Sequence, residues 1–322
     1  MFQEALLEKI KKELPKNTSL NEALATVLDI SYDAAHRRTS LKSKFSLEES
    51  VLLARYFNVS LDALFGVTQK EFVSVEKTKQ ITNENELKEY FESSYQSLFP
   101  LLSVKESEIY YSAKDIPLFY TLGNTTLSKF KLYVWLKLLD KNFRKKRFEE
   151  YHPSLSIVQS AEKLGSLYQD LSVTEIWDVT TINSTLKQIH FYYKAGQIST
   201  DVAVKICEDL KGLLKEISLK VISKSESFKL YYNELLLMNN NVLVIAPQVK
   251  SLFVPNSMLS YFTTSDKRTT EEAERYFNEQ FYHSKLLNKA GEKEQNMFFH
   301  KMLEKVTALE RLIEAENILD FE

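Results

Sequence analysis

The residues best suited to chemistry form a basic cluster within the first seventy positions of the chain. No acidic residue interrupts the segment from His36 to Lys44, and its other cations are Arg37, Arg38 and Lys42. The forked arginine side chain can bond O6 and N7 of guanine, whereas lysine pairs with phosphate as a point charge. The cluster therefore holds the two kinds of side chain that contact with double-stranded DNA requires.

A short helix over residues 31–40 is expected to present this cluster. Ser31 is its predicted N-cap, and its chief core-facing residues are the small Ala34 and Ala35, so most of its surface stays polar. The preceding helix begins with a capping box at Ser19, and only two or three residues separate the two helices. Helices joined so closely must cross steeply, as in a helix-turn-helix.

Three further helices complete the predicted N-terminal domain. Apolar residues at helical spacing mark a helix over residues 2–14, and a second capping box at Ser46 opens a later helix. Ser60 caps a last turn. We predict a five-helix domain over residues 1–68, followed by a linker over residues 69–82.

Residues 19–66 resemble the lambda-repressor-like (Cro/cI, XRE-type) helix-turn-helix domain of transcriptional regulators. In the second helix and the turn, the matching residues are Leu24, Ala25, Leu28, Ile30 and Ser31. In the last two helices they are Ser46, Leu47, Glu48, Leu53, Ala54 and the run from Asn58 to Leu64. The string from Ile30 to Arg38 is similar to a Bacteroidetes-type group of these regulators. The turn carries Asp29 where the family usually has glycine, which adopts a left-handed backbone more readily.

The resemblance implies a role for the polar residues of this region. Asn21 and Ser31 are implied to contact phosphate at the N-termini of two helices, and Tyr32, Asp33 and Arg37 to point into the major groove. The remaining implied DNA contacts are His36, Arg38, Lys42 and Lys44. Arg38 is assigned to phosphate because many relatives carry an apolar residue at its position.

Two other hypotheses remain open at this stage. The first is a helical adaptor that binds a peptide and no DNA; Asp33 favours it, because a carboxylate repels phosphate, although it could accept from a cytosine amino group. The second is RNA binding, which needs exposed aromatic side chains on a sheet. The candidates for that role are Tyr231, Tyr232, Tyr261 and Phe262.

The remaining chain, residues 83–322, is predicted to be mostly helical. Helices are expected over residues 84–103, 125–140, 156–172, 179–195, 200–222, 270–288 and 292–316. Two β-prone runs, 228–232 and 242–245, flank an asparagine-rich turn and predict a hairpin in a small antiparallel sheet over 228–264. The predicted fold class is therefore mainly α, and this domain is expected to serve dimerisation or effector sensing.

The last predicted helix carries apolar residues at alternating spacings of three and four. They are Phe299, Met302, Val306, Leu309 and Ile313. Such a seam packs against its own domain, the interpretation we favour, or pairs two copies as a coiled coil. A separate run of cations between Lys137 and Arg147 is expected to be a solvated helix end.

Composition and spacing give no indication of an enzyme, a metal site or a cofactor. The six glycines are isolated, which excludes standard phosphate loops and Rossmann turns, and no two of the five histidines lie three or four residues apart. The sole cysteine, Cys207, excludes an intrachain disulfide, and the net charge of −2 excludes an overall basic coat. No apolar run is long enough to span a membrane, and the amphipathic N-terminus is unlike a signal peptide.

These observations combine into one predicted function. The chain is expected to be a cytoplasmic, non-enzymatic transcriptional regulator that binds double-stranded DNA as a homodimer through residues 31–40 and responds to an unidentified effector. Its two half-sites should lie about one helical turn, or about 34 Å, apart. The adaptor alternative predicts no salt-dependent affinity for DNA.

Overall fold

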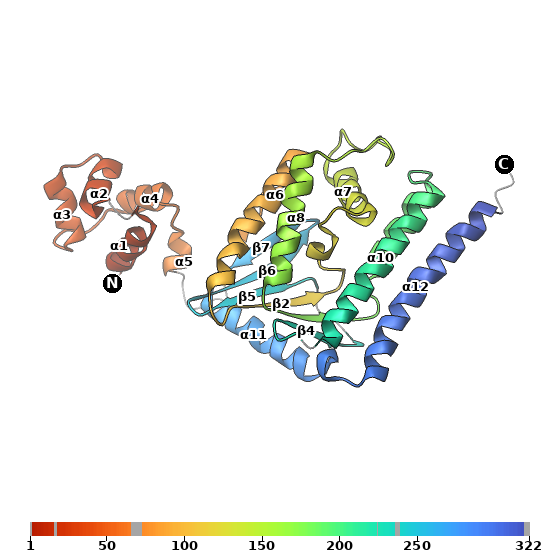
Figure 1. Ribbon diagram of the computed structural model, residues 1–322. Helices are drawn as coiled ribbons and strands as arrows, with labels where there is room; N and C mark the ends of the chain where they lie inside the picture. The colour runs from red at the N-terminus through yellow and green to blue at the C-terminus, as the bar shows by residue number, and fades with distance from the viewer. Residues whose placement is uncertain (1, 16–17, 66–72, 224, 236–238, 319–322) are drawn as a thin grey trace. The chain divides into compact units, whose positions relative to one another are not determined.

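The chain divides into two compact units, residues 1–74 and residues 75–322. The computed structural model describes residues 2–15, 18–65, 73–223, 225–235 and 239–318, which Figure 1 draws as ribbons and arrows. Residues 69–72 of the predicted linker lie outside the described residues. Its later residues 76–77 form a strand of the second unit.

The first unit contains the five helices expected from the sequence. They are α1 (Phe2–Glu13), α2 (Leu20–Leu28), α3 (Tyr32–Thr39), α4 (Leu47–Tyr56) and α5 (Leu61–Phe65). The helices surround one small apolar core made by Leu6, Leu7, Ile10, Leu24, Ala35, Leu53 and Val59. Each helix is too short to be stable alone, so this shared core is what holds the unit together.

Local capping sets where these helices begin and end. The Ser31 hydroxyl accepts from the Ala34 N–H at 3.2 Å, and the capping box at Ser46 is complete. The capping box predicted at Ser19 does not form, because that side chain makes no cap hydrogen bond. Asp29 ends α2 in the left-handed conformation, with φ 52° and ψ 49°, a backbone that glycine adopts more readily than aspartate.

The second unit is an α/β fold, and the prediction of a mainly α chain with a small antiparallel sheet is wrong. Helices make up 58% of the structure, but one mixed sheet of eight strands runs through the unit. In spatial order the strands are β1 (Glu76–Lys77), β7 (Ser260–Thr264), β6 (Val249–Ser257), β5 (Val242–Ala246), β2 (Glu108–Ala113), β3 (Val173–Trp177), β4 (Phe228–Tyr232) and β8 (Lys285–Leu286).

Three parallel strands form the centre of this sheet. β2 pairs with β3 and β3 with β4, all in parallel, and helices make both crossovers. The first crossover contains the 3₁₀ turn η2 (Leu118–Thr121), α7 (Thr126–Leu139) and α8 (Leu155–Asp170); the second contains α9 (Asn183–Lys194) and α10 (Thr200–Ile222). The predicted hairpin between residues 228–232 and 242–245 is wrong, because β2 and β3 lie between these two strands.

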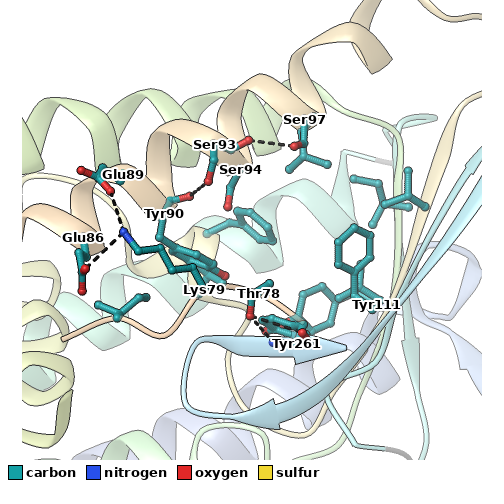
Figure 2. Close-up of a pocket in the computed structure, with 18 of the residues that line it drawn as sticks. Thr78, Lys79, Glu86, Glu89, Tyr90, Ser93, Ser94, Ser97, Tyr111 and Tyr261 are labelled. Atoms are coloured by element: carbon teal, nitrogen blue, oxygen red, sulfur yellow. Dashed lines mark hydrogen bonds and ion pairs between the residues drawn. The ribbon is translucent and has the colours of Figure 1, made fainter. Parts of the chain in front are cut away.

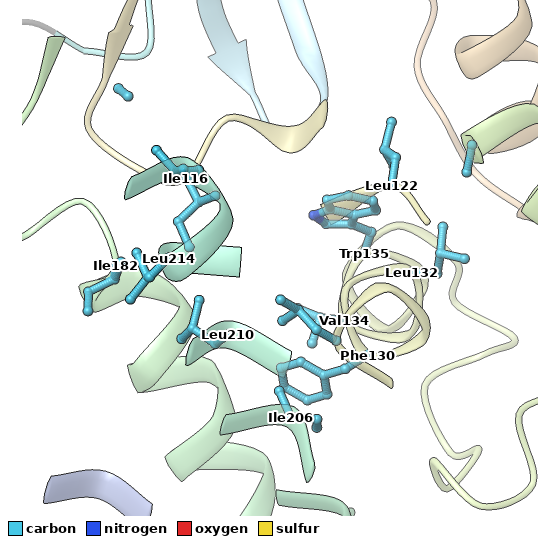
Figure 3. Packing of buried hydrophobic residues seen from close by; sticks show 14 of the residues in the cluster. Ile116, Leu122, Phe130, Leu132, Val134, Trp135, Ile182, Ile206, Leu210 and Leu214 are labelled. Atoms are coloured by element: carbon cyan, nitrogen blue, oxygen red, sulfur yellow. The ribbon is translucent and has the colours of Figure 1, made fainter. Parts of the chain in front are cut away.

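The two faces of the sheet are covered unequally. Helices α6 (Glu84–Leu98), α7, α8, α10 and α12 (Glu292–Ile318) lie on one face, and α11 (Lys267–Tyr282) lies on the other (Figure 1). Figure 3 shows Phe130 and Val134 of α7 near Ile206 and Leu210 of α10 in the larger core.

The apolar seam of the last helix is used within its own unit. Met302, Val306 and Ile313 are fully buried, and α12 packs along α10. The seam therefore stabilises the second unit and presents no stripe to a second copy.

Helix α8 passes unusually close to the chain that precedes α7. A Cβ atom added at Gly165 would collide with the carbonyl oxygen of Leu122 and would come within 3.1 Å of that of Phe119. Glycine at this position lets α8 approach the backbone of η2 directly.

Candidate nucleic-acid interface

Helix α3 buries only a small side chain in the core of the first unit. Ala35 is completely buried, whereas Tyr32, Asp33, His36 and Arg37 are exposed. Positions 32, 33, 36 and 37 lie along one side of a helix because they are separated by three or four residues. The side chains predicted to read bases thus form one polar, solvent-facing surface.

A hydrogen-bond network fixes the position of α3 against α2. The Asn21 amide nitrogen donates to the Tyr32 hydroxyl at 3.2 Å and lies 3.4 Å from Nδ1 of His36. The Asn21 amide oxygen accepts from the Thr39 hydroxyl at 2.6 Å. Asn21, which was predicted to contact phosphate, therefore bonds through both its amide nitrogen and its amide oxygen within the protein and braces the two helices.

Arg38, which was also predicted to contact phosphate, has partners within the protein. Its Nε and Nη2 donate to the two carboxylate oxygens of Glu49 at 3.1 and 2.5 Å, and its Nη1 donates to the Ala34 carbonyl at 3.1 Å. The side chain is only 19% exposed. Arg38 therefore clamps α3 to α4, and hydrogen bonding from Arg38 holds the pKa of the Glu49 carboxyl below its ordinary value.

Three of the cations predicted to contact DNA remain available on the surface. Arg37, Lys42 and Lys44 are exposed, and none of them pairs with a carboxylate in the parts of the first unit that the structure describes, where the ion pairs are Lys9–Glu13 and Arg38–Glu49. An unpaired exposed cation loses no internal partner when it meets a phosphate.

The loop after α3 is ordered by the protein itself. The Lys42 and Ser43 N–H groups both donate to the Arg37 carbonyl, at 2.8 and 3.0 Å. Gln3 of α1 donates to the Arg38 and Ser43 carbonyls, at 2.9 and 2.8 Å, and accepts from the Phe45 N–H at 3.0 Å. Sequence reasoning missed Gln3, because no spacing rule relates it to a loop forty residues away.

Ser31 keeps one hydrogen-bonding function free for a ligand. Its hydroxyl oxygen accepts from Ala34 N–H, which leaves the hydroxyl hydrogen to be donated outward from an exposed position. The helix N-terminus adds partial positive charge at the same place. Ser31, Arg37, Lys42 and Lys44 together form what we call the basic face, opposed on α3 by the single carboxylate of Asp33.

Comparison with known proteins yields no relative: no family model, no curated protein and no solved structure matches the chain. Within the described residues there is no group of three or more His, Cys, Asp or Glu side chains that could hold a metal ion. Over the same residues, no helix is both long enough and apolar enough to cross a bilayer.

Proposed function

We propose that this chain is a sequence-specific transcriptional regulator that inserts α3 into the major groove of double-stranded DNA. The observation that carries the proposal is the state of Arg37, which is exposed and unpaired on a helix whose other arginine is paired with Glu49. A rigidly held helix with one free arginine fork is suited to a two-point contact with guanine.

The rest of the basic face is suited to the DNA backbone. Ser31, Lys42 and Lys44 flank the two ends of α3, where phosphates pass on either side of a groove-bound helix. Tyr32, Asp33 and His36 face the same way as Arg37 and are the proposed neighbours of the bases.

One small unit covers only one half-site, so we propose binding as a homodimer, with half-sites about 34 Å apart. We further propose that the chain binds DNA in the cytoplasm.

The adaptor function is a second candidate, favoured by apolar side chains on α4. Leu47, Leu52 and Tyr56 are 75%, 50% and 67% exposed. Exposed apolar residues of this size are typical of surfaces that bind another protein. The two functions differ in one measurable property, since only the first requires affinity for DNA that falls steeply with salt.

A selection of bound duplexes from a random-sequence pool, followed by gel-shift titration, tests the proposal. We expect Arg37→Ala to weaken binding by about 1–3 kcal/mol and to relax the preference at one base position. Arg55→Ala, which removes an exposed arginine of α4, is the matched control and should leave the preference unchanged. Equal affinity of the wild type for all duplexes, without salt dependence, would favour the adaptor.

A further inference from the structure

The second unit contains a cavity that the proposed DNA contacts do not use. Its volume is about 470 Å³, within the range of small-molecule sites in proteins. It lies between α6 and the sheet, and Figure 2 shows Tyr90 of α6 facing Tyr111 of β2 and Tyr261 of β7 across it. Every residue that lines it belongs to the second unit.

The walls of the cavity are largely apolar. Leu98 of α6 forms one side, and Ile109, Val242 and Val244 of the central strands form the other. Phe119 of η2 adds an aromatic surface, and its ring stacks on Tyr168 with centroids 4.1 Å apart. Walls of this kind favour an apolar ligand, because binding removes apolar surface of both ligand and protein from water.

Hydroxyl groups supply part of the polar lining. The lining includes Tyr90, Tyr111 and Tyr261, and the serines Ser93, Ser94 and Ser97 of α6. Burial raises the pKa values of all three tyrosines, so they stay neutral donors and acceptors at physiological pH. They offer hydrogen bonds to a ligand without offering a charge.

The only cation among the lining residues, all of which the structure describes, is already paired. The Lys79 ammonium lies 3.3 Å from a Glu86 carboxylate oxygen and 3.6 Å from one of Glu89, at an exposed rim. Two carboxylates against one ammonium leave the rim net negative. An anionic ligand would therefore be repelled rather than neutralised.

The cavity also touches the beginning of the second unit. Thr78 and Ile81 are among its lining residues and follow directly after β1. Thr78 is tied to Tyr261 by three hydrogen bonds: its N–H and its hydroxyl donate to the Tyr261 carbonyl at 3.0 and 3.4 Å, and its hydroxyl accepts from the Tyr261 N–H at 2.8 Å. A ligand against Tyr261 thus lies beside Thr78 and Ile81, near the beginning of the second unit.

From this geometry we propose that the cavity binds a small, uncharged, mainly apolar molecule with one hydrogen-bonding group directed at the Tyr111 and Tyr261 hydroxyls. That this molecule is the effector of a DNA-binding regulator rests on the proposed function. That the cavity is a binding site does not.

The test is a fluorescence titration of the full-length chain with N-phenyl-1-naphthylamine, an uncharged apolar dye that brightens when it leaves water. We expect saturable binding at one site in the wild type. Ser94→Leu fills the cavity from α6 and should weaken binding about tenfold or more. Gln96→Leu, an exposed position on the same helix outside the cavity, is the matched control and should bind like the wild type.

A second variant, Val244→Phe, fills the cavity from the opposite wall. It keeps the site testable if Ser94→Leu does not fold. Circular dichroism melting confirms that each variant is folded. Absence of saturable binding in the wild type, or equal affinity in the wild type and in both folded filling variants, overturns the proposed site.

Displacement of the dye tests the charge of the ligand. We expect 1-decanol to displace the dye at lower concentration than decanoate, because the carboxylates of Glu86 and Glu89 repel the carboxylate of decanoate. The reverse order overturns the uncharged class. Since neither titration contains DNA, its failure is distinguishable from a failure of the proposed function.

Discussion

Arg38 and Glu49 form a two-point ion pair between α3 and α4, with Nε–Oε2 and Nη2–Oε1 distances of 3.1 and 2.5 Å. The same Glu49 carboxylate accepts from the Ser46 N–H at 3.0 Å and so closes the capping box of α4. One carboxylate therefore both starts α4 and orients α3. The two neighbouring arginines of α3 consequently have different roles, Arg38 inside the unit and Arg37 on its surface.

Arg38→Ala should destabilise the first unit, whereas Arg37→Ala should not. Loss of a well-formed, mostly buried pair leaves Glu49 without its partner, and we expect a fall of about 1–3 kcal/mol in the free energy of unfolding. Hydrogen exchange of the α3 amides in the full-length chain measures it. Equal protection of α3 in both variants would contradict the clamp.

Lys42→Ala and Lys44→Ala should each weaken DNA binding without changing base preference. Removing one lysine–phosphate interaction reduces the slope of log affinity against log salt by about 0.9. Gel-shift titrations at several salt concentrations give that slope. The control is Lys11→Ala, which removes an exposed lysine of α1. A slope that falls equally in all three variants would mean that the loop makes no specific phosphate contact.

Asp29→Gly should stabilise the turn between α2 and α3. Asp29 has φ 52°, and a residue with a Cβ atom incurs a steric penalty there that glycine avoids. We expect a gain of about 0.5–1 kcal/mol, partly offset by the freer unfolded chain. Hydrogen exchange of α2 and α3 measures the gain. Asp29→Ala keeps the Cβ atom and should show none; reduced protection in the glycine variant would contradict the prediction.

Glu175 should make the second unit less stable as pH rises. This carboxyl is fully buried and accepts from the Tyr120 and Tyr168 hydroxyls and from Trp177 Nε1, at 2.8, 2.7 and 2.6 Å. Burial raises its pKa to about 7, against these hydrogen bonds and the nearby Lys220, which lower it. The pKa of Glu175 is higher in the folded protein than the ordinary value near 4.5, so protonated Glu175 stabilises the folded state to its full extent below about pH 4.5. This stabilisation is lost as pH rises through about 7.

We therefore expect the free energy of unfolding to fall by up to about 3 kcal/mol between pH 5 and 8. Urea titrations followed by tryptophan fluorescence at each pH measure the change. Glu175→Gln should remove most of the dependence, and Glu226→Gln, at an exposed position, should retain it. An unchanged pH profile in Glu175→Gln would show that another group titrates.

Gly165→Ala should destabilise the second unit, because the new methyl group meets the Leu122 carbonyl oxygen. Overpacking against backbone costs about 1–3 kcal/mol. Gly212→Ala provides the matched control, since its added Cβ would meet no side chain and no other segment of the chain within 4 Å, and this helix substitution should stabilise by about 0.5–1 kcal/mol. Thermal unfolding of both variants gives the comparison; similar shifts would contradict the close approach.

The helices were predictable from the sequence because their signals are local. Capping residues such as Ser31 and Ser46 act on N–H groups three positions away, and the apolar stripe of each helix repeats within a few residues. The exposed, stripe-poor character of α3 followed from the same information. The polar partners of Arg38 and Asn21 did not, because they lie on helices that meet α3 only after folding.

The sequence by itself determined the helical segments and the cationic character of α3, since both depend on neighbours along the chain. Only the tertiary structure decided that β2 and β3 exist, that they separate β4 from β5, and that Tyr90, Tyr111 and Tyr261 enclose a cavity. Short strands buried on both faces lack alternating polarity, and their hydrogen-bond partners come from remote segments. Pairing of this kind depends on the packing of the whole unit, which no local pattern contains.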